Sequence, residues 1–174
     1  MMDIQIPTGM SWGGLSQEHP RKAFQSGAPA ADEWLQKRAL QHQSKHLSVT
    51  KVLLDSSGAI AGYFTIATGQ VDFGDLPAEI IRKLPRRALP VAVLAWLGVD
   101  SKHQRRGLGR ILVAQAFRDC YEAGKTFAFV AVILDALDDR AKSFYQQWDF
   151  AELPGHPYRL FLTAGQLDAL MKSK

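Results

Sequence analysis

The chain has 174 residues, of which 47% are hydrophobic and 22% charged, and its formal net charge is +4. This is the composition of a globular protein with a buried core, and the length favours one domain over residues 1–174. No run of eighteen apolar residues occurs, and residues 1–14 lack the basic start and apolar block of a signal peptide, so we expect no membrane span and a cytoplasmic protein.

The cysteine and histidine content argues against disulfide and metal chemistry. The single cysteine, Cys120, excludes an internal disulfide, and its apolar helical surroundings favour a buried, inert thiol over a nucleophile. Only His42 and His46 have the i, i+4 spacing of a zinc pair, and no third ligand accompanies them. We therefore expect no metal site.

The first half of the chain predicts a helix and a hairpin. Residues 1–30 are rich in Gly, Pro and Ser and carry few structural signals. Apolar residues at i, i+4 and i+8 predict a helix over residues 31–43. Residues 50–55 and 59–68 read as two strands of a hairpin, and residues 76–84 read as a short helix with Pro77 in its first turn.

The second half predicts alternating strands and helices. Residues 90–99 and 127–134 are apolar runs typical of buried strands, separated by a helix that Gly124 stops. A helix over residues 138–148, a strand over residues 158–162 and a closing helix with a Thr163–Gln166 capping box follow. This order predicts an α/β or α+β domain with a parallel step in its sheet.

The basic residues are concentrated in one segment. Eight of the 21 lie between positions 82 and 110, where Asp100 is the only acid. They are Arg82, Lys83, Arg86, Arg87, Lys102, Arg105, Arg106 and Arg110. Such a segment attracts an anionic partner, either a phosphorylated cofactor or a nucleic acid, although a solvated basic face is an equally good interpretation.

The stretch HQRRGLGR, residues 103–110, is called the glycine loop below. It places Gly107 and Gly109 at the start of the central helix, where backbone N–H groups lack partners and carry partial positive charge. Glycine has no Cβ, so a phosphate can approach these N–H groups closely. Arg105, Arg106 and Arg110 add charge around the same anion. The loop therefore predicts a phosphate-binding site, the alternative being a glycine-bearing helix start without a ligand.

The spacing of the glycine loop distinguishes between known phosphate loops. It fits neither the dinucleotide fingerprint nor the P-loop. The pattern Gln104, Gly107, Gly109 resembles the acetyl-CoA pyrophosphate loop of the GCN5-related N-acetyltransferases, the GNAT superfamily. Residues 133–150, ILDALDDRAKSFYQQWDF, add the aspartate, alanine and Phe-Tyr pattern that this superfamily shows after its next strand.

The resemblance implies a fold and a cofactor site. The fold is a central mixed, mostly antiparallel sheet with a parallel splayed strand pair, flanked by helices. The co-substrate is acetyl-CoA. The residues that the resemblance assigns to acetyl-CoA are Leu97, Val99, Gln104, Arg105, Arg106, Gly107, Leu108, Gly109, Arg110 and Asp138.

The first half narrows the resemblance to one branch of the superfamily. Residues 24–43, FQSGAPAADEWLQKRALQHQ, residues 62–65, GYFT, and the Leu84-Pro85 step look like the acetyltransferase toxins of type II toxin–antitoxin modules. Ser26, Ala31 and Trp148-Asp149-Phe150 depart from that pattern. The branch implies acetylation of the amino group of aminoacyl-tRNA and neutralisation by a ribbon-helix-helix antitoxin, and a homodimer is left open.

Tyr145 is the candidate catalytic residue. An amine attacks the thioester and the thiolate of coenzyme A leaves, and a phenol is protonated at neutral pH and donates to that thiolate. The alternatives are a packed aromatic role for Tyr145 and a simple helix N-cap role for Asp138. By the resemblance, backbone groups of Leu97 and Val99 contact the pantetheine arm.

No side chain stands out as the general base. Asp32, Glu33 and Asp135 are candidates, and none is favoured. An α-amine has a pKa of about 7.7–8.0 against about 10.4 for lysine, so it needs less help from a base. This favours an α-amine as acceptor over a lysine side chain. A small amine, peptide or protein N-terminus and a non-catalytic acyl-CoA- or nucleic-acid-binding module remain as alternatives.

The tRNA-binding candidates, called the basic cluster below, are Arg82, Lys83, Arg86 and Arg87.

Overall fold

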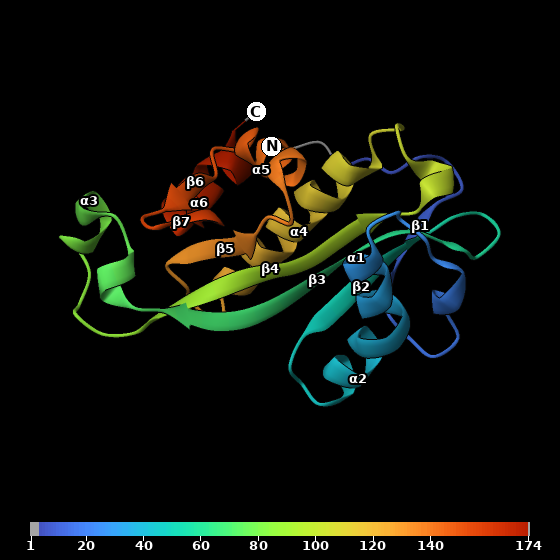
Figure 1. The fold of residues 1–174 in the computed structure, drawn as a ribbon, viewed down its shortest axis with the longest axis horizontal. Coiled ribbons are helices and arrows are strands. Elements are labelled where there is room, and N and C mark those ends of the chain that lie inside the picture. Colours follow the sequence, from blue (N-terminus) through green and yellow to red (C-terminus); the bar gives the residue numbers. More distant parts are fainter. Residues whose placement is uncertain (1–3, 174) are drawn as a thin grey trace. The chain divides into compact units, whose positions relative to one another are not determined.

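A computed structural model describes residues 4–173, and its elements follow the sequence from blue to red in Figure 1. The strands are β1 Ser11–Gly14, β2 Val49–Leu54, β3 Ile60–Val71, β4 Leu89–Val99, β5 Ala131–Asp135, β6 Ala151–Leu153 and β7 His156–Thr163. The α-helices are α1 Pro29–Glu33, α2 Ala39–Ser44, α3 Ala78–Ile81, α4 Leu108–Gly124, α5 Asp139–Gln146 and α6 Ala164–Lys172. A π-helix, Trp34–Arg38, joins α1 to α2, and short 3-10 helices occur at Arg21–Ala23, Phe73–Asp75 and Ser101–His103.

The strands form one seven-stranded sheet in the order β1-β2-β3-β4-β5-β7-β6. The pairs β1–β2, β2–β3, β5–β7 and β6–β7 are antiparallel. The pair β4–β5 is parallel, and its ladder joins Val91–Val93 to Ala131–Ile133 and stops there, although β4 continues to Val99. The predicted mixed, mostly antiparallel sheet with a parallel pair and flanking helices is confirmed.

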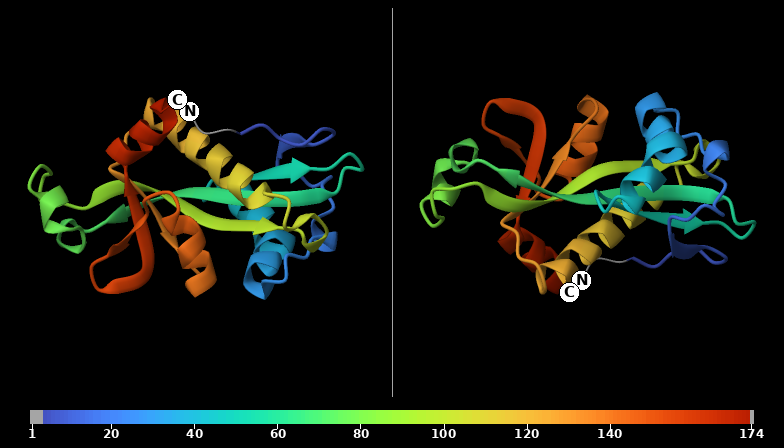
Figure 2. Two further views of the ribbon diagram at one scale, coloured as in Figure 1. Left: turned by 90° about the horizontal axis from the view of Figure 1, so that it is seen from above. Right: turned by 90° about the horizontal axis from the view of Figure 1, so that it is seen from below.

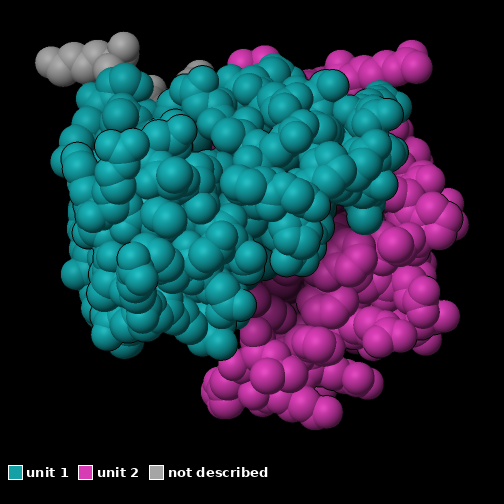
Figure 3. Space-filling model, turned by 60° about the vertical axis from the view of Figure 1, so that its left-hand side comes forward, with its two compact units in different colours: residues 1, 68–93, 119–174 teal, residues 2–67, 94–118 magenta. Residues whose placement is uncertain are grey.

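The chain divides into two compact units (Figure 3). Unit 1 contains residues 1, 68–93 and 119–174, and unit 2 contains residues 2–67 and 94–118. Each is described separately.

In unit 2 the β2–β3 hairpin lies between α1–α2 on one face and the first half of α4 on the other (Figure 2). Neighbouring residues of a strand point to opposite faces of the sheet, and Gly62 and Tyr63 of β3 do so. A Cβ on Gly62 would lie 2.8 Å from the Leu112 side chain of α4, whereas the Tyr63 hydroxyl donates to the Ala31 carbonyl of α1 at 2.6 Å. Gly62 is therefore the residue that lets α4 approach the sheet.

Unit 2 has an apolar core that contains three hydrogen-bonded polar groups. The core contains Leu15, Phe24, Trp34, Leu35, Ala39, Val52, Ile60 and Tyr63. The Trp34 indole N–H donates to Thr65 Oγ1 at 3.0 Å, and Thr65 Oγ1 lies 2.7 Å from Thr50 Oγ1. Because both hydroxyls are fully buried, these bonds satisfy groups that would otherwise be costly to bury.

Unit 1 has its own core around β5 and β7. Its buried members are Val71, Leu76, Leu89, Val91, Ala131, Ile133, Leu153 and Phe161. The segment between β3 and β4 carries the 3-10 helix Phe73–Asp75 and α3, and Leu76 at 4% exposure anchors this segment to the core. The basic residues that follow α3 are thereby held on a packed element.

Several predicted boundaries are wrong. The strand predicted over residues 127–134 begins only at Ala131, because the Phe127 N–H still donates to the Ala123 carbonyl of α4, and Phe127 is 79% exposed. The helix predicted over residues 76–84 is reduced to α3, with Pro77 as its N-cap residue. The helix over residues 31–43 is confirmed but contains the π-helix. Strands β1 and β6 were not predicted.

Other local predictions are confirmed. Asp138 caps α5 by accepting from the Ala141 N–H at 2.8 Å, and Thr163 and Gln166 form the capping box of α6. Cys120 is buried at 3% exposure, as its helical surroundings predicted. Within residues 4–173, no helix is long and apolar enough to cross a membrane.

Candidate functional site

The glycine loop connects the end of β4 to the start of α4 and has unusual backbone geometry. Arg105 and Gly107 both have left-handed φ angles, 65° and 76°. Glycine adopts this conformation without the steric cost that a Cβ brings. A Cβ built on Gly107 meets nothing within 4 Å, so the space in front of the loop is open. Gly107 therefore both makes the turn and leaves room for a ligand to approach the backbone.

Side-chain bonds tie the glycine loop to its surroundings. The Gln104 amide donates to the Val99 carbonyl at 2.9 Å and to the Ser26 carbonyl at 2.6 Å. The carboxylate of Asp100, 7% exposed, accepts from the Lys102 N–H and from the Gln25 N–H. These bonds hold the end of β4, the loop and residues 25–26 together. The two bonds of Asp100 were not predicted from the sequence.

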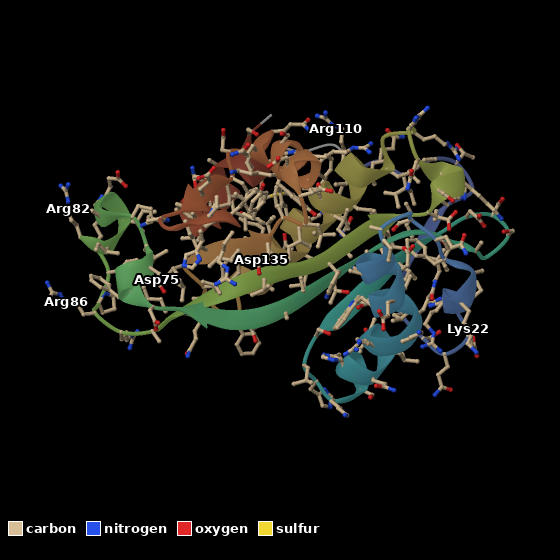
Figure 4. The ribbon with its side chains drawn as sticks, viewed as in Figure 1. Lys22, Asp75, Arg82, Arg86, Arg110 and Asp135 are labelled. Atoms are coloured by element: carbon tan, nitrogen blue, oxygen red, sulfur yellow. The ribbon has the colours of Figure 1, made fainter. Side chains whose placement is uncertain are left out.

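The start of α4 is strongly basic. Arg105, Arg106 and Arg110 are exposed there, and Arg110 is labelled at the start of the helix in Figure 4. Leu108, 1% exposed, anchors the first turn in the core. The partial positive charge of the helix start and the charges of these guanidinium groups add together, which favours an anion at this position. All of these residues, together with Leu97 and Val99 near the end of β4, belong to unit 2.

Tyr145 lies on α5 in unit 1, among aromatic side chains. Its ring contacts Phe144 with a centroid distance of 5.2 Å and Phe150 with one of 6.1 Å. Burial raises the pKa of the Tyr145 hydroxyl above its ordinary value near 10. The phenol therefore remains protonated throughout the physiological pH range and is able to donate a proton. The packed aromatic role is also observed, and the two are compatible.

Two of the three candidate bases already have partners. Asp32 accepts from the Ser26 hydroxyl at 2.6 Å and from the Ser26 and Gly27 N–H groups. Asp135 forms a two-point ion pair with Arg159, at 2.8 and 3.3 Å, and this pairing raises the pKa of Arg159. Neither carboxylate is positioned as an unengaged base. Among residues 4–173 there is also no group of three or more His, Cys, Asp or Glu that could hold a metal.

The basic cluster lies on one stretch of unit 1, between α3 and β4. Arg82, Lys83, Arg86 and Arg87 are all exposed. Figure 4 shows Arg82 and Arg86 pointing outward from this stretch. The Arg86 guanidinium lies 5.9 Å from the centre of the Phe73 ring, a cation–π contact that leaves its outer face to solvent.

Strand β4 continues beyond its parallel ladder with β5 and is followed by a basic, left-handed glycine loop at the start of α4, an arrangement suited to a phosphate-bearing ligand. Residues 15–150 match the acetyltransferase (GNAT) family, and the chain belongs to this family. It is therefore an N-acetyltransferase by family.

Known relatives agree with this assignment. A protein named tRNA-acetylating toxin from Mycobacterium tuberculosis (strain ATCC 25618 / H37Rv) is 35% identical over 149 residues, covering 86% of this chain and 89% of the relative. The solved structure of AtaT complexed with acetyl-methionyl-tRNAfMet has a TM-score of 0.85 at 21% identity, covering 94% of this chain and 99% of that one. A tyrosine-to-phenylalanine mutant of AtaT, bound to the C-terminus of the antitoxin AtaR and acetyl-CoA, has a TM-score of 0.80 at 18% identity, covering 95% and 99% of the two chains.

Proposed function

We propose that this protein is an acetyl-CoA-dependent N-acetyltransferase that acetylates the amino group of aminoacyl-tRNA and so acts as a toxin that blocks translation. The observation that carries the proposal is the 35% identity, over 86% of the chain, to a relative named tRNA-acetylating toxin. The open glycine loop and the exposed basic cluster agree with it.

Acetyl-CoA binds along the end of β4 and the glycine loop. Backbone N–H groups from Gly107 to Gly109 and Arg110 hold the pyrophosphate, with Arg105 and Arg106 adding charge. Leu108 and Gln104 keep the loop in place. Leu97 and Val99 contact the pantetheine arm through their backbones, because β4 continues beyond its ladder with β5. Asp138 adds a contact to the cofactor besides capping α5.

Transfer follows from direct attack of the acceptor amine on the thioester carbonyl. A backbone N–H of β4 stabilises the negative charge that develops on the carbonyl oxygen. When the tetrahedral intermediate collapses, the carbon–sulfur bond breaks and the Tyr145 hydroxyl gives its proton to the departing thiolate. The attacking nitrogen loses one proton to water, and the Tyr145 phenolate regains a proton from water. An α-amine is partly neutral at pH 7, so it attacks without a strong base, in agreement with the engagement of Asp32 and Asp135.

The remaining parts of the proposal concern partners and location. The basic cluster binds tRNA phosphates, and a ribbon-helix-helix antitoxin neutralises the toxin. The chain acts as one domain over residues 1–174 and works in the cytoplasm.

The test is transfer of a radioactive acetyl group from acetyl-CoA to a defined acceptor. We expect label on charged tRNA and none on uncharged tRNA, and alkaline deacylation releases it as an N-acetyl amino acid. A peptide with a free N-terminus and a small primary amine serve as competing acceptors. Label on either of them but not on charged tRNA would contradict the tRNA proposal and leave the acetyltransferase activity standing.

A further inference from the structure

Three side chains of unit 2 contact one another in series beside the start of α4. Two of them, Asp55 and His103, have no part in the transfer chemistry described above. The three are Asp55 in the turn between β2 and β3, His103 in the 3-10 helix after β4, and Arg106 in the glycine loop. His103 Nε2 lies 3.1 Å from Asp55 Oδ2, and Arg106 Nη1 lies 3.0 Å from His103 Nδ1. The hairpin turn is thereby connected to a charged side chain of the glycine loop.

The chemistry of the two outer groups fixes the state of the imidazole between them. A guanidinium only donates hydrogen bonds and an ionised carboxylate only accepts them. One state of His103 satisfies both: the neutral ring with its proton on Nε2, which donates to Asp55 while Nδ1 accepts from Arg106. Protonation of His103 turns Nδ1 into a donor and removes the bond to Arg106.

The Asp55 end of the chain is rigid. Its Oδ1 accepts from the Ser57 hydroxyl at 2.6 Å, from the Ser57 N–H at 2.9 Å and from the Ala59 N–H at 3.0 Å. These bonds, with the contact to His103, lower the pKa of Asp55 to about 2, so the carboxylate is ionised at neutral pH. The Asp55 and His103 side chains are 18% and 15% exposed, whereas Arg106 is exposed. The chain thus runs from a fixed, sheltered anchor to a long side chain that would otherwise move freely.

We propose that His103 is a positioning residue that holds Arg106 in place for a phosphate of acetyl-CoA, with Asp55 as its anchor. The inference rests on the proposed acetyl-CoA site. One guanidinium N–H is used for His103, and the other donors remain for phosphate oxygens. A side chain ordered before binding loses less conformational freedom when the ligand arrives, so the affinity is higher.

A double-mutant cycle tests whether His103 acts through Arg106. Calorimetry gives the Kd of acetyl-CoA for the wild type, His103→Ala, Arg106→Ala and the double variant. We expect each single substitution to raise Kd by about 5- to 10-fold, and the double variant to be no weaker than Arg106→Ala alone. Multiplying effects in the double variant would overturn the inference, because His103 would then act independently of Arg106.

The same cycle separates this inference from the proposed function. An Arg106→Ala variant that binds acetyl-CoA as tightly as the wild type would overturn the positioning role while the acetyl-CoA site stood. A wild-type protein that does not bind acetyl-CoA would remove the proposed function, and the inference with it.

Two amide substitutions at position 103 distinguish a positioning role from a purely structural one, because a structural role would affect the acetyl-CoA affinity of both variants equally. Asn at position 103 places an acceptor near Nδ1 and keeps the bond to Arg106, whereas Gln places its amide near Nε2 and keeps only the bond to Asp55. We expect His103→Asn to restore most of the affinity and His103→Gln to resemble His103→Ala. Equal behaviour of the two amides would contradict the inference.

Discussion

Gly107 combines a left-handed backbone with open space at its Cβ position, as Gly155 also does, and it stands directly before α4. Its left-handed backbone explains why a helix-weakening residue stands at the start of α4, and the open space at its Cβ position explains how an anion reaches the N–H groups behind it. Gly155 has the same kind of backbone, with φ 80° and nothing within 4 Å, but it lies in the β6–β7 turn. The two positions therefore separate backbone strain from ligand contact.

Gly107→Ala should lower the free energy of unfolding by about 1–2 kcal/mol, the cost of a left-handed alanine. It should also raise the Kd of acetyl-CoA more than tenfold, because the added methyl group occupies the approach of the phosphate. Gly155→Ala should show the loss of stability with an unchanged Kd. Chemical denaturation and calorimetry measure both quantities, and equal Kd values for the two variants would argue against phosphate contact at Gly107.

Tyr145→Phe keeps the ring and its contacts with Phe144 and Phe150 but removes the proton that the mechanism needs. The transfer rate should fall by about 10²–10⁴, the usual contribution of a general acid, while the Kd of acetyl-CoA changes little. Because burial raises the pKa of the hydroxyl, the wild-type rate should show no loss from phenol ionisation up to about pH 10. A variant with a wild-type rate would identify Tyr145 as a packing residue only.

The hairpin turn between β2 and β3 is an element held together by one carboxylate. The pKa of Asp55 is lowered first by the Ser57 hydroxyl and then by the Ala59 and Ser57 N–H groups. A carboxylate whose pKa is lower in the folded than in the unfolded chain contributes stability that is present above the unfolded value near 4. That stability is lost as the pH falls towards 2.

Asp55→Asn should therefore reduce the free energy of unfolding at pH 7 by about 1 kcal/mol, a modest value because solvent screens the turn. The difference between wild type and variant should shrink between pH 5 and pH 2 and vanish below it. Urea unfolding at several pH values measures this difference. A difference that stays constant across this range would show that the turn does not depend on the charge of Asp55.

Elements governed by local rules were predictable from the sequence. The apolar run that forms β4, the caps of α5 and α6 at Asp138 and Thr163, and the glycine-marked start of α4 all depend on neighbouring residues. Strand β1 depends on distant residues instead: the sequence SWGG has little strand propensity, and Trp12 pairs with Leu53 far along the chain. The apolar residues directly after α4 were predicted as part of a strand. They are not in it, because the Phe127 N–H bonds back to the Ala123 carbonyl and completes a turn.

The candidate site likewise combines features that depend on neighbouring residues with contacts that depend on distant ones. The glycine spacing and the arginines are local features, so the sequence alone is enough to propose them. The bonds that hold the loop, from Gln104 to Ser26 and from Asp100 to Gln25, join residues more than 70 positions apart. No local pattern contains such pairings, and the contact of His103 with Asp55 is invisible in the sequence for the same reason. The sequence therefore predicts which groups bind, but only the fold shows what positions them.

At the scale of the whole molecule, the proposed function gives the basic residues two different tasks. Those of the glycine loop lie at a helix start, where an anion already gains from the backbone. Those of the basic cluster lie on the stretch between α3 and β4, where no helix begins. Their exposure suits phosphates spaced along a backbone, and each phosphate that they neutralise releases bound counterions. Salt dependence is therefore the property that distinguishes a tRNA acceptor from a small amine.

Replacing Arg86 and Arg87 together by alanine should raise the KM for charged tRNA about tenfold and reduce the slope of log affinity against log salt by about 2. The Kd of acetyl-CoA should be unchanged, because the cofactor site uses the glycine loop. Lys22→Ala with Lys37→Ala, at two exposed positions of unit 2, removes the same charge and serves as the control. It should shift the rate slightly and leave the slope nearly intact. If the two double variants give parallel salt curves of equal height, Arg86 and Arg87 do not contact tRNA, and the acceptor must be held elsewhere. If turnover of a small amine falls with the same pair while charged tRNA is unaffected, the acceptor itself has been misassigned.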